Sequence, residues 1–398
     1  MRFDPVTSEK SLLALLAAIV MLAPFAIDAY LPALGIIAQD LAASEALVQY
    51  TIGSFLLGLA FGPLLAGPLS DAIGRRPVLI FGLLGFAFFS LACALVTNAE
   101  TFVVFRFFQA LMGSASLLAG RALMADVYSG DELSQKQSII MVAAVIAPMI
   151  APLLGGWVSS GLGWRYIFWG LVLGGLIAAT VSMLQLPETL LVERRNPMAI
   201  SQIIEGYLGV AQNPVAMMYL LAISFMSGAF FVYVAATPFL YIETYGMSVQ
   251  AYAWLFTVGA FLAGLANFAN FFVVKQIGYR STLFWQGMLV IVCGIALFCG
   301  ASGLFGRWAI FGPGLLMMPL LHVIGNNSLT GVMDQFDARK GTASAFAMSS
   351  RFAIGMIAVA IVGQYNGSVE MQYGLILFVF AVLAGVTAQV AVCWDKSR

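Results

Sequence analysis

Stretches of about 20 mostly apolar residues, the length an α-helix needs to cross a bilayer, recur along nearly the whole of this 398-residue chain. Hydrophobic residues make up 62% of the sequence and charged residues only 9%, against roughly 25% charged in soluble domains. The mean hydropathy is +0.97. With so few charges, most of the surface must face lipid or other protein rather than water.

Breaks at charges, Gly, Pro and polar clusters divide the apolar sequence into twelve predicted membrane-spanning helices. They are 11–34, 46–69, 77–97, 101–125, 135–159, 164–186, 213–238, 249–273, 281–301, 306–331, 340–364 and 370–393. The segment 187–212 is the one long polar stretch between them. We therefore predict an all-α membrane protein, with one six-helix bundle at 1–186, a linker at 187–212 and a second six-helix bundle at 213–398.

The two predicted bundles share a few features in the same order. Gly74 follows the second helix and Gly278 the eighth, while Pro32 ends the first helix and Pro238 the seventh. Two similar halves joined by a linker are typical of secondary transporters built from internal repeats. The halves are therefore expected to be pseudo-symmetric.

Lysine and arginine in the loops predict the orientation, because loops on the cytoplasmic side carry an excess of both. With both termini cytoplasmic, thirteen basic residues fall inside and two, Arg165 and Arg307, outside. The thirteen are Arg2, Lys10, Arg75, Arg76, Lys136, Arg194, Arg195, Lys275, Arg280, Arg339, Lys340, Lys396 and Arg398. We predict a multi-pass protein of the bacterial inner membrane with both termini and the linker in the cytoplasm.

Several functional classes are disfavoured by composition. The net charge is zero, with no basic run to bind nucleic acid. No Gly-x-x-x-x-Gly-Lys-Ser/Thr loop is present, so ATP is not expected to drive the protein. With one histidine, His322, and one acid well inside a span, a membrane enzyme is the weaker alternative. We predict no enzyme activity, no cofactor and no metal site.

The loop after the second predicted helix combines an acid, a glycine and two arginines in the string Gly67-Pro-Leu-Ser-Asp71-Ala-Ile-Gly74-Arg75-Arg76-Pro77. Gly74 permits a tight turn, and Asp71 can pair with a cation or cap a helix. The alternative is an ordinary charged turn. The matching string of the second half keeps glycine and arginine, but Lys275 stands where the acid would be, which argues against an acid-based contact there.

Asp28, near the end of the first predicted helix, is the one acid placed well inside an apolar span. Burial disfavours the ionised form of a carboxylate, so such a group can bind and release protons near neutral pH. It is a candidate for proton exchange and for contact with a cationic substrate. The alternative is a structural Asp held by the chain break at Pro32.

Arg106 and Gln109 lie on one face of the helix 101–125. A charge inside a span is costly and normally faces the bundle interior or water. The alternative is an arginine that extends to the headgroups. Asp126, at the inner end of the same helix, is a second candidate for proton coupling.

Prolines and glycines interrupt the helix 135–159 in the string Ala147-Pro148-Met-Ile-Ala151-Pro152-Leu-Leu-Gly155-Gly156. Proline removes a backbone hydrogen bond and glycine allows close packing, so this helix is expected to bend. The alternative is a kinked helix without a special mechanism.

Weaker candidates are aromatic or polar residues within spans. Tyr30, Phe231 and Tyr233 are candidate aromatic substrate contacts, with core packing as the alternative. Asn326 is a candidate polar contact, with hydrogen bonding between helices as the alternative. Arg351 either faces a substrate cavity or pairs near the inner side.

These motifs resemble those of the major facilitator superfamily over nearly the whole chain. The loop resembles G-x-L-x-D-x-x-G-R-R/K, Arg106 and Gln109 match R-x-x-Q-G with Ala110 for glycine, and Pro152, Gly155 and Gly156 match the antiporter motif G-x-x-x-G-P-x-x-G-G. The string Asp28-Ala-Tyr30-Leu-Pro32 resembles D-x-Y-L-P of the bicyclomycin/chloramphenicol-resistance branch of drug:proton antiporters.

The resemblance implies a major facilitator fold and a proton-coupled exporter of small amphipathic compounds that works by alternating access. It implies proton coupling by Asp28, Arg106 and Asp126, substrate binding by Asp28, Tyr30, Gln109, Phe231, Tyr233 and Asn326, and gating by Asp71, Gly74, Arg75, Arg76, Pro152, Gly155 and Gly156. The expected partners are a small-molecule substrate, protons and the lipid bilayer, with the protein a monomer. Export of a native metabolite such as a siderophore, sugar or polyamine is the alternative within transport.

Overall fold

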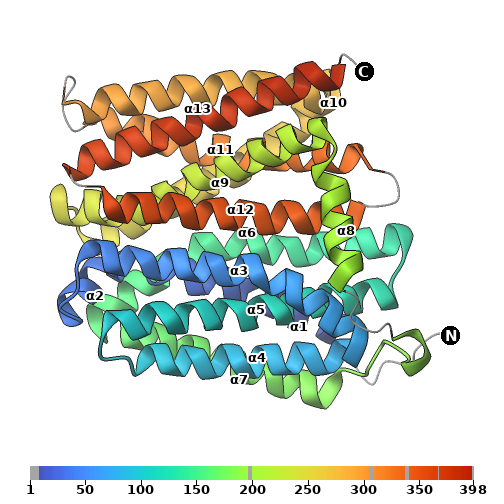
Figure 1. Cartoon of the computed structure of the whole chain (residues 1–398). Coiled ribbons are helices and arrows are strands. Elements are labelled where there is room, and N and C mark those ends of the chain that lie inside the picture. The colour runs from blue at the N-terminus through green and yellow to red at the C-terminus, as the bar shows by residue number, and fades with distance from the viewer. Residues whose placement is uncertain (1–8, 196–199, 304–307, 337–339, 366, 397–398) are drawn as a thin grey trace. The chain divides into compact units, whose positions relative to one another are not determined.

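The computed structural model describes residues 9–195, 200–303, 308–336, 340–365 and 367–396, and every regular element in these residues is a helix (Figure 1). The elements are α1 (Glu9–Asp28), η1 (Leu31–Ala33), α2 (Leu34–Asp40), α3 (Glu45–Ile73), α4 (Arg75–Ala94), α5 (Ala99–Val127), α6 (Gly130–Gly161), α7 (Arg165–Gln185), η2 (Val192–Arg194), α8 (Ile200–Ala211), α9 (Pro214–Pro238), η3 (Phe239–Thr244), α10 (Val249–Ala301), α11 (Trp308–Asp334), α12 (Lys340–Gln364) and α13 (Val369–Lys396).

Eleven helical segments of the described residues are long and apolar enough to cross a membrane. One of them, α10, has 53 residues and a non-helical break at Gly278. A continuous helix of that size would be about 80 Å long, more than twice the thickness of the hydrocarbon core. The break therefore divides α10 into two spans, and the predicted all-α fold of twelve membrane helices is confirmed.

The first predicted span, 11–34, lies within one candidate membrane span, Glu9–Asp40, but its helix is interrupted. In the structure α1 ends at Asp28, and a 3₁₀ turn, η1, leads into the short helix α2. Pro32 has no N–H to donate, and its ring disfavours helical backbone at Leu31. The break places Asp28 at a helix end, where the chain is free to change direction.

Contacts between Cα atoms divide the chain into two units. Unit 1 comprises Met1–Ala43 and Ser54–Ile200, and unit 2 comprises Ser44–Gly53 and Ser201–Arg398. One boundary falls inside the segment 187–212, which in its described part holds η2 and α8, and the first residues of α3 group with unit 2.

The same packing pattern recurs inside each unit. In unit 1, α4 packs against α5 and α7, and α1 packs against α6. In unit 2, α10 packs against α11 and α13, and α9 packs against α12. These helices occupy corresponding places in the two halves of the sequence, so the units have the pseudo-symmetry expected of an internal repeat.

Gly74 and Gly278 also have matching roles. Gly74 has a φ of 114° directly before α4, and Gly278 has a φ of 77° at the break in α10. Side chains with a Cβ rarely adopt a positive φ, whereas glycine does so readily. The two glycines that the sequence pairs therefore make equivalent turns.

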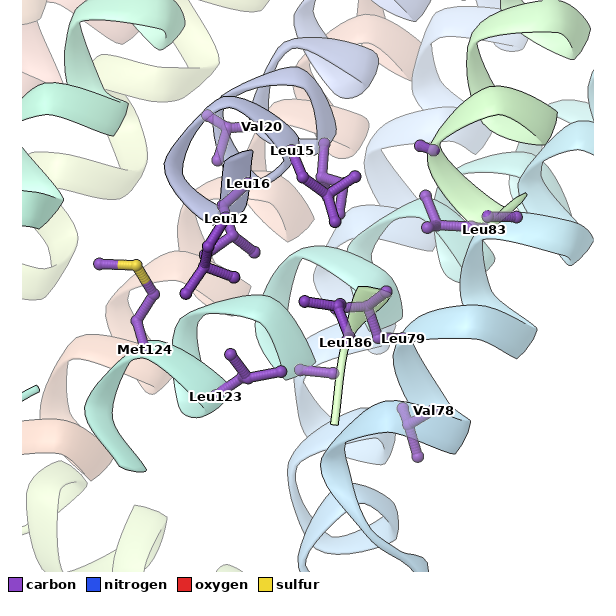
Figure 2. Close-up of a cluster of buried hydrophobic side chains, with 14 of the residues drawn as sticks. Leu12, Leu15, Leu16, Val20, Val78, Leu79, Leu83, Leu123, Met124 and Leu186 are labelled. Carbon is purple, nitrogen blue, oxygen red and sulfur yellow. The ribbon is translucent and has the colours of Figure 1, made fainter. Parts of the chain in front are cut away.

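A cluster of buried hydrophobic side chains, many of them leucines, lies inside unit 1. In Figure 2, Leu12 and Leu16 of α1 lie near Leu123 and Met124 of α5, with Leu79 of α4 beside them. These side chains are 9% exposed or less. Their packing fixes the ends of α4 and α5, which carry the charged residues described below.

Candidate coupling and gating sites

Arg106 of α5 lies inside unit 1 with none of its surface exposed. Its guanidinium carbon is 4.4 Å from the ring centre of Tyr30 and 4.2 Å from that of Phe55. The face of an aromatic ring attracts a cation, so the two rings compensate part of the hydration that the guanidinium has lost. This enclosure argues against an arginine that extends to the headgroups.

A hydrogen-bonded chain holds one end of the Arg106 guanidinium. Its Nη1 donates to Gln109 Oε1 at 2.7 Å, and Gln109 Nε2 donates to Ser90 Oγ at 2.7 Å. Ser90 in turn donates to the carbonyl of Phe86 at 2.7 Å. Gln109, a predicted substrate contact, is itself fully buried, so its visible role is to position Arg106.

The other donors of Arg106 are unused. Its Nε and Nη2 are enclosed and have no hydrogen-bond partner among the residues that the structure describes. A buried donor without a partner costs roughly 1–3 kcal/mol, and more when the group is charged. Such donors suit a site that an acceptor occupies for only part of a working cycle.

Asp28, the last residue of α1, is 6% exposed. Within the described part of the chain, its carboxylate has neither an ion pair nor a hydrogen bond. Tyr30, two residues later, is the ring that contacts Arg106. A buried acid, two residues from Tyr30 in the chain, and a buried cation against the Tyr30 ring thus occur in unit 1 without forming an ion pair.

The proline-containing helix α6 packs directly on this region. It contacts α1 and η1, and Pro152, Gly155 and Gly156 are all buried. A Cβ placed at Gly155 would overlap the backbone carbonyl of Ala29, the residue after Asp28. The close approach of α6 to the chain break therefore requires glycine at this position.

The predicted gating loop forms a compact charged cluster. Arg75 contacts Asp71 of α3 through Nη1 and Asp126 of α5 through Nε, the latter at 3.2 Å. The Asp71 side chain is 51% exposed, so the pair with Arg75 alone adds little stability. Its effect lies in connecting the ends of α3, α4 and α5 at one point.

Asp126 belongs to this cluster and not to the surroundings of Arg106. The two residues are 20 positions apart on the continuous helix α5, a separation of about 30 Å. The predicted proton-coupling residues therefore fall into two places, Asp28 and Arg106 at one end and Asp126 at the other.

Sequence reasoning missed the contribution of the segment after α7. Glu188 accepts hydrogen bonds from the backbone N–H groups of Arg75 at 3.0 Å and Arg76 at 3.2 Å, and Thr189 donates to Asp126 at 2.9 Å. A carboxylate at the start of a helix satisfies free N–H groups and opposes the positive end of the helix dipole. In the sequence, Glu188 is one of several charged residues in the polar segment 187–212, and nothing there relates it to the start of α4.

The corresponding loop of unit 2, in which Lys275 stands where unit 1 has Asp71, contacts acids of other helices. Arg280 donates to Asp395 of α13 at 2.5 Å and to Asp334 of α11 at 3.1 Å, and Tyr219 donates to Asp395 at 2.9 Å. The acids come from other helices rather than from the loop itself. Their position at the inner ends of predicted helices was the signal available in the sequence.

The remaining substrate candidates lie in unit 2. Phe231 and Tyr233 are 3% and 2% exposed, and Phe231 lies 6.1 Å from the ring of Phe352. Asn326 is exposed and donates to Asn267 at 2.7 Å, which fits hydrogen bonding between helices.

Comparison with known sequences identifies one family. Residues 16–360 match the sequence model of the Major Facilitator Superfamily. The uncharacterized MFS-type transporter YdgK of Bacillus subtilis is 33% identical, over 97% of this chain and 96% of the relative. The bicyclomycin resistance protein homolog of Haemophilus influenzae is 32% identical, over 88% of this chain and 87% of the relative.

Solved structures share the fold at low sequence identity. A D-xylose-proton symporter aligns with a TM-score of 0.74 and 13% identity, covering 96% of this chain and 97% of the symporter. A bacterial homologue of the human lysosomal transporter Spinster aligns with a TM-score of 0.72 and 15% identity, covering 98% and 97% of the two chains.

Proposed function

Because this chain belongs to the major facilitator superfamily, we propose that it is a proton-coupled secondary exporter of small amphipathic compounds that works by alternating access. The superfamily consists of membrane transporters, so the protein is a multi-pass transporter and not an enzyme. Its two bundles, 1–186 and 213–398, would move as the alternating halves, with 187–212 as the linker. It would act as a monomer in the inner membrane.

The buried, unpaired carboxylate of Asp28 is the observation that carries proton coupling. An acid that is closed off from water favours the protonated form, and one that is opened to water releases the proton. Alternating exposure of Asp28 would therefore load and unload one proton in each cycle. The break at η1 gives this segment the freedom to move.

Arg106 would couple proton exchange at Asp28 to the conformational change of unit 1. Its two unused N–H groups could donate to the ionised carboxylate of Asp28 when the proton leaves, and these hydrogen bonds would break when the proton returns. Such an exchange changes the position of η1 against α6, where Ala29 and Gly155 are in close contact. The Arg75 cluster would hold the inner side of unit 1 closed during part of the cycle.

Drug export as the physiological activity is supported by the names of relatives. They include the bicyclomycin resistance protein homolog of Haemophilus influenzae and a chloramphenicol resistance protein of Pseudomonas aeruginosa, which is 30% identical over 88% of this chain and 83% of the relative. In this proposal Asp28 and aromatic side chains such as Tyr30 and Tyr233 contact the substrate.

Export should depend on the proton gradient and not on ATP. In a pump-deficient bacterial strain that expresses the chain, an uncoupler is expected to restore drug accumulation to the level of the empty strain, while ATP depletion with the gradient maintained should have little effect. The measurement is time-resolved accumulation of a panel of drugs and metabolites. Efflux that resists the uncoupler but stops without ATP would overturn the proposal, and efflux confined to a metabolite would replace drug export as the main role.

Both termini and the linker should be cytoplasmic. Reporter fusions after residue 186 and at the C-terminus are expected to score on the cytoplasmic side, because basic residues concentrate in the loops of that side. A fusion between α5 and α4, near Asn98, serves as the periplasmic control. A periplasmic signal from either of the first two fusions would reverse the topology.

A further inference from the structure

Arg351 of unit 2 is a cation inside a membrane-spanning helix that the proposed mechanism does not use. It lies near the middle of α12, and its side chain is half-buried. A charged group in the middle of a membrane-spanning helix costs free energy, and it normally has a functional partner. The groups around Arg351 therefore indicate what kind of partner it binds.

Protein contacts occupy only part of the Arg351 guanidinium. Its Nε donates to Ser227 Oγ of α9 at 3.0 Å, and its Nη1 lies 3.9 Å from the sulfur of Met348. Nη2 has no hydrogen-bond partner among the described residues, and it is not completely enclosed by protein. One charged donor is thus both free and accessible.

No acid of unit 2 pairs with Arg351 within the described residues. The acids there lie in terminal turns, in η3 or in the short helix α8, far along the chain from the middle of any span: Glu45, Glu205, Glu243, Asp334, Glu370 and Asp395. Asp334 and Asp395 are already bound to Arg280. Among the residues of unit 2 that the structure describes, none supplies a compensating negative charge to Arg351.

His322 adds a second polar group at the same depth. It lies near the middle of α11, and its Nδ1 is 3.0 Å from the carbonyl of Met318. A carbonyl only accepts, so Nδ1 carries the hydrogen and Nε2 is left as an acceptor in the neutral ring. Ring contacts connect His322 to the residue after Arg351, because Phe230, which touches His322, packs on Phe231, and Phe231 lies 6.1 Å from Phe352.

Aromatic rings border these polar groups. The ring of Phe352 has its centre 5.4 Å from the Arg351 guanidinium, and Phe230 lies edge-on to His322 at 5.2 Å. Both rings are half-buried rather than sealed. The combination offers one free cationic donor beside apolar aromatic surface.

We propose that Arg351 is a substrate-recognition residue that binds the carboxylate of an aromatic anion, with Phe230 and Phe352 contacting the ring system. The planar guanidinium suits a carboxylate, and a hydrogen bond between charged groups is stronger than one between neutral groups. This inference rests on the proposed exporter function and narrows its substrate class. The competing reading is structural, in which Arg351 only joins α12 to α9 through Ser227.

The test compares two probes of the same shape. Binding of 2-naphthoate and of the neutral 2-naphthamide is measured by calorimetry on the full chain in nanodiscs, without a proton gradient. Wild type is expected to bind naphthoate at least about tenfold more tightly than the amide, the size of one charged hydrogen bond. Arg351→Gln should remove that preference and leave amide binding unchanged.

Two further variants separate recognition from structure. Arg351→Lys keeps the charge and should retain part of the preference, whereas Ser227→Ala removes the bond between helices and should retain all of it. A wild type that binds neither probe, or prefers neither, overturns the proposal without reference to any variant. Equal weakening of both probes in Arg351→Gln, matched by Ser227→Ala, assigns a structural role instead. Because no gradient is present, these results are independent of the uncoupler experiment on export.

Discussion

Replacing Asp28 with Asn is expected to leave the protein folded and inserted but to abolish export driven by the proton gradient. Asn keeps the shape of the side chain and its capacity to accept hydrogen bonds, but it cannot titrate. In the described structure the carboxylate has no ion pair or hydrogen bond to lose, so the cost in stability should be small. The effect on transport should nevertheless be complete, because no proton could be exchanged at this position.

The measurement is proton release from the purified protein when substrate is added. Asp28→Asn should reduce the release to background, and Asp28→Glu, which moves the carboxylate by one methylene, should retain part of it. Asp40→Asn is the matched control, because Asp40 is an exposed acid of the neighbouring helix α2 that pairs with Arg165. Normal release from Asp28→Asn would mean that another acid carries the proton, with Asp126 the next candidate.

The fold was largely predictable because its signals are local. Each span is a continuous apolar run, and positive φ at Gly74 and Gly278 is a property of a single residue. The end of α1 at Asp28 was less predictable, because the effect of Pro32 reaches back over several residues. The apolar pattern alone continues through the break, so it indicated one helix from 11 to 34.

The candidate site was predictable as residue types but not as partners. Asp28 and Arg106 were found because a charge within an apolar run is conspicuous. The rings of Tyr30 and Phe55, which contact Arg106, come from the chain break after α1 and from α3, and no spacing in the sequence relates them. The acids that pair with Arg280 were missed for the same reason, since Asp395 lies 115 positions away along the chain.

Replacing Gly155 with Ala is expected to impair both stability and transport. The added methyl group would overlap the backbone carbonyl of Ala29, and a backbone atom cannot rotate away as a side chain can. Helix α6 would have to move off η1, at a cost of about 1–3 kcal/mol for overpacking. A shift of about 1 kcal/mol between two conformations changes their ratio about fivefold, so export should fall by at least about that factor.

The control is Gly170→Ala in α7 of the same unit, where an added Cβ meets nothing within 4 Å. Alanine is the better helix former, so this variant should match or exceed wild type in stability. Melting temperature and export are measured for both variants in nanodiscs and vesicles. If Gly155→Ala behaves like Gly170→Ala, the close approach of α6 to the Asp28 segment plays no part in transport. A specific loss at Gly155 would instead indicate that the bending of α6 and the movement of Asp28 occur together, because Ala29 is bonded directly to the residue that we propose as the proton carrier.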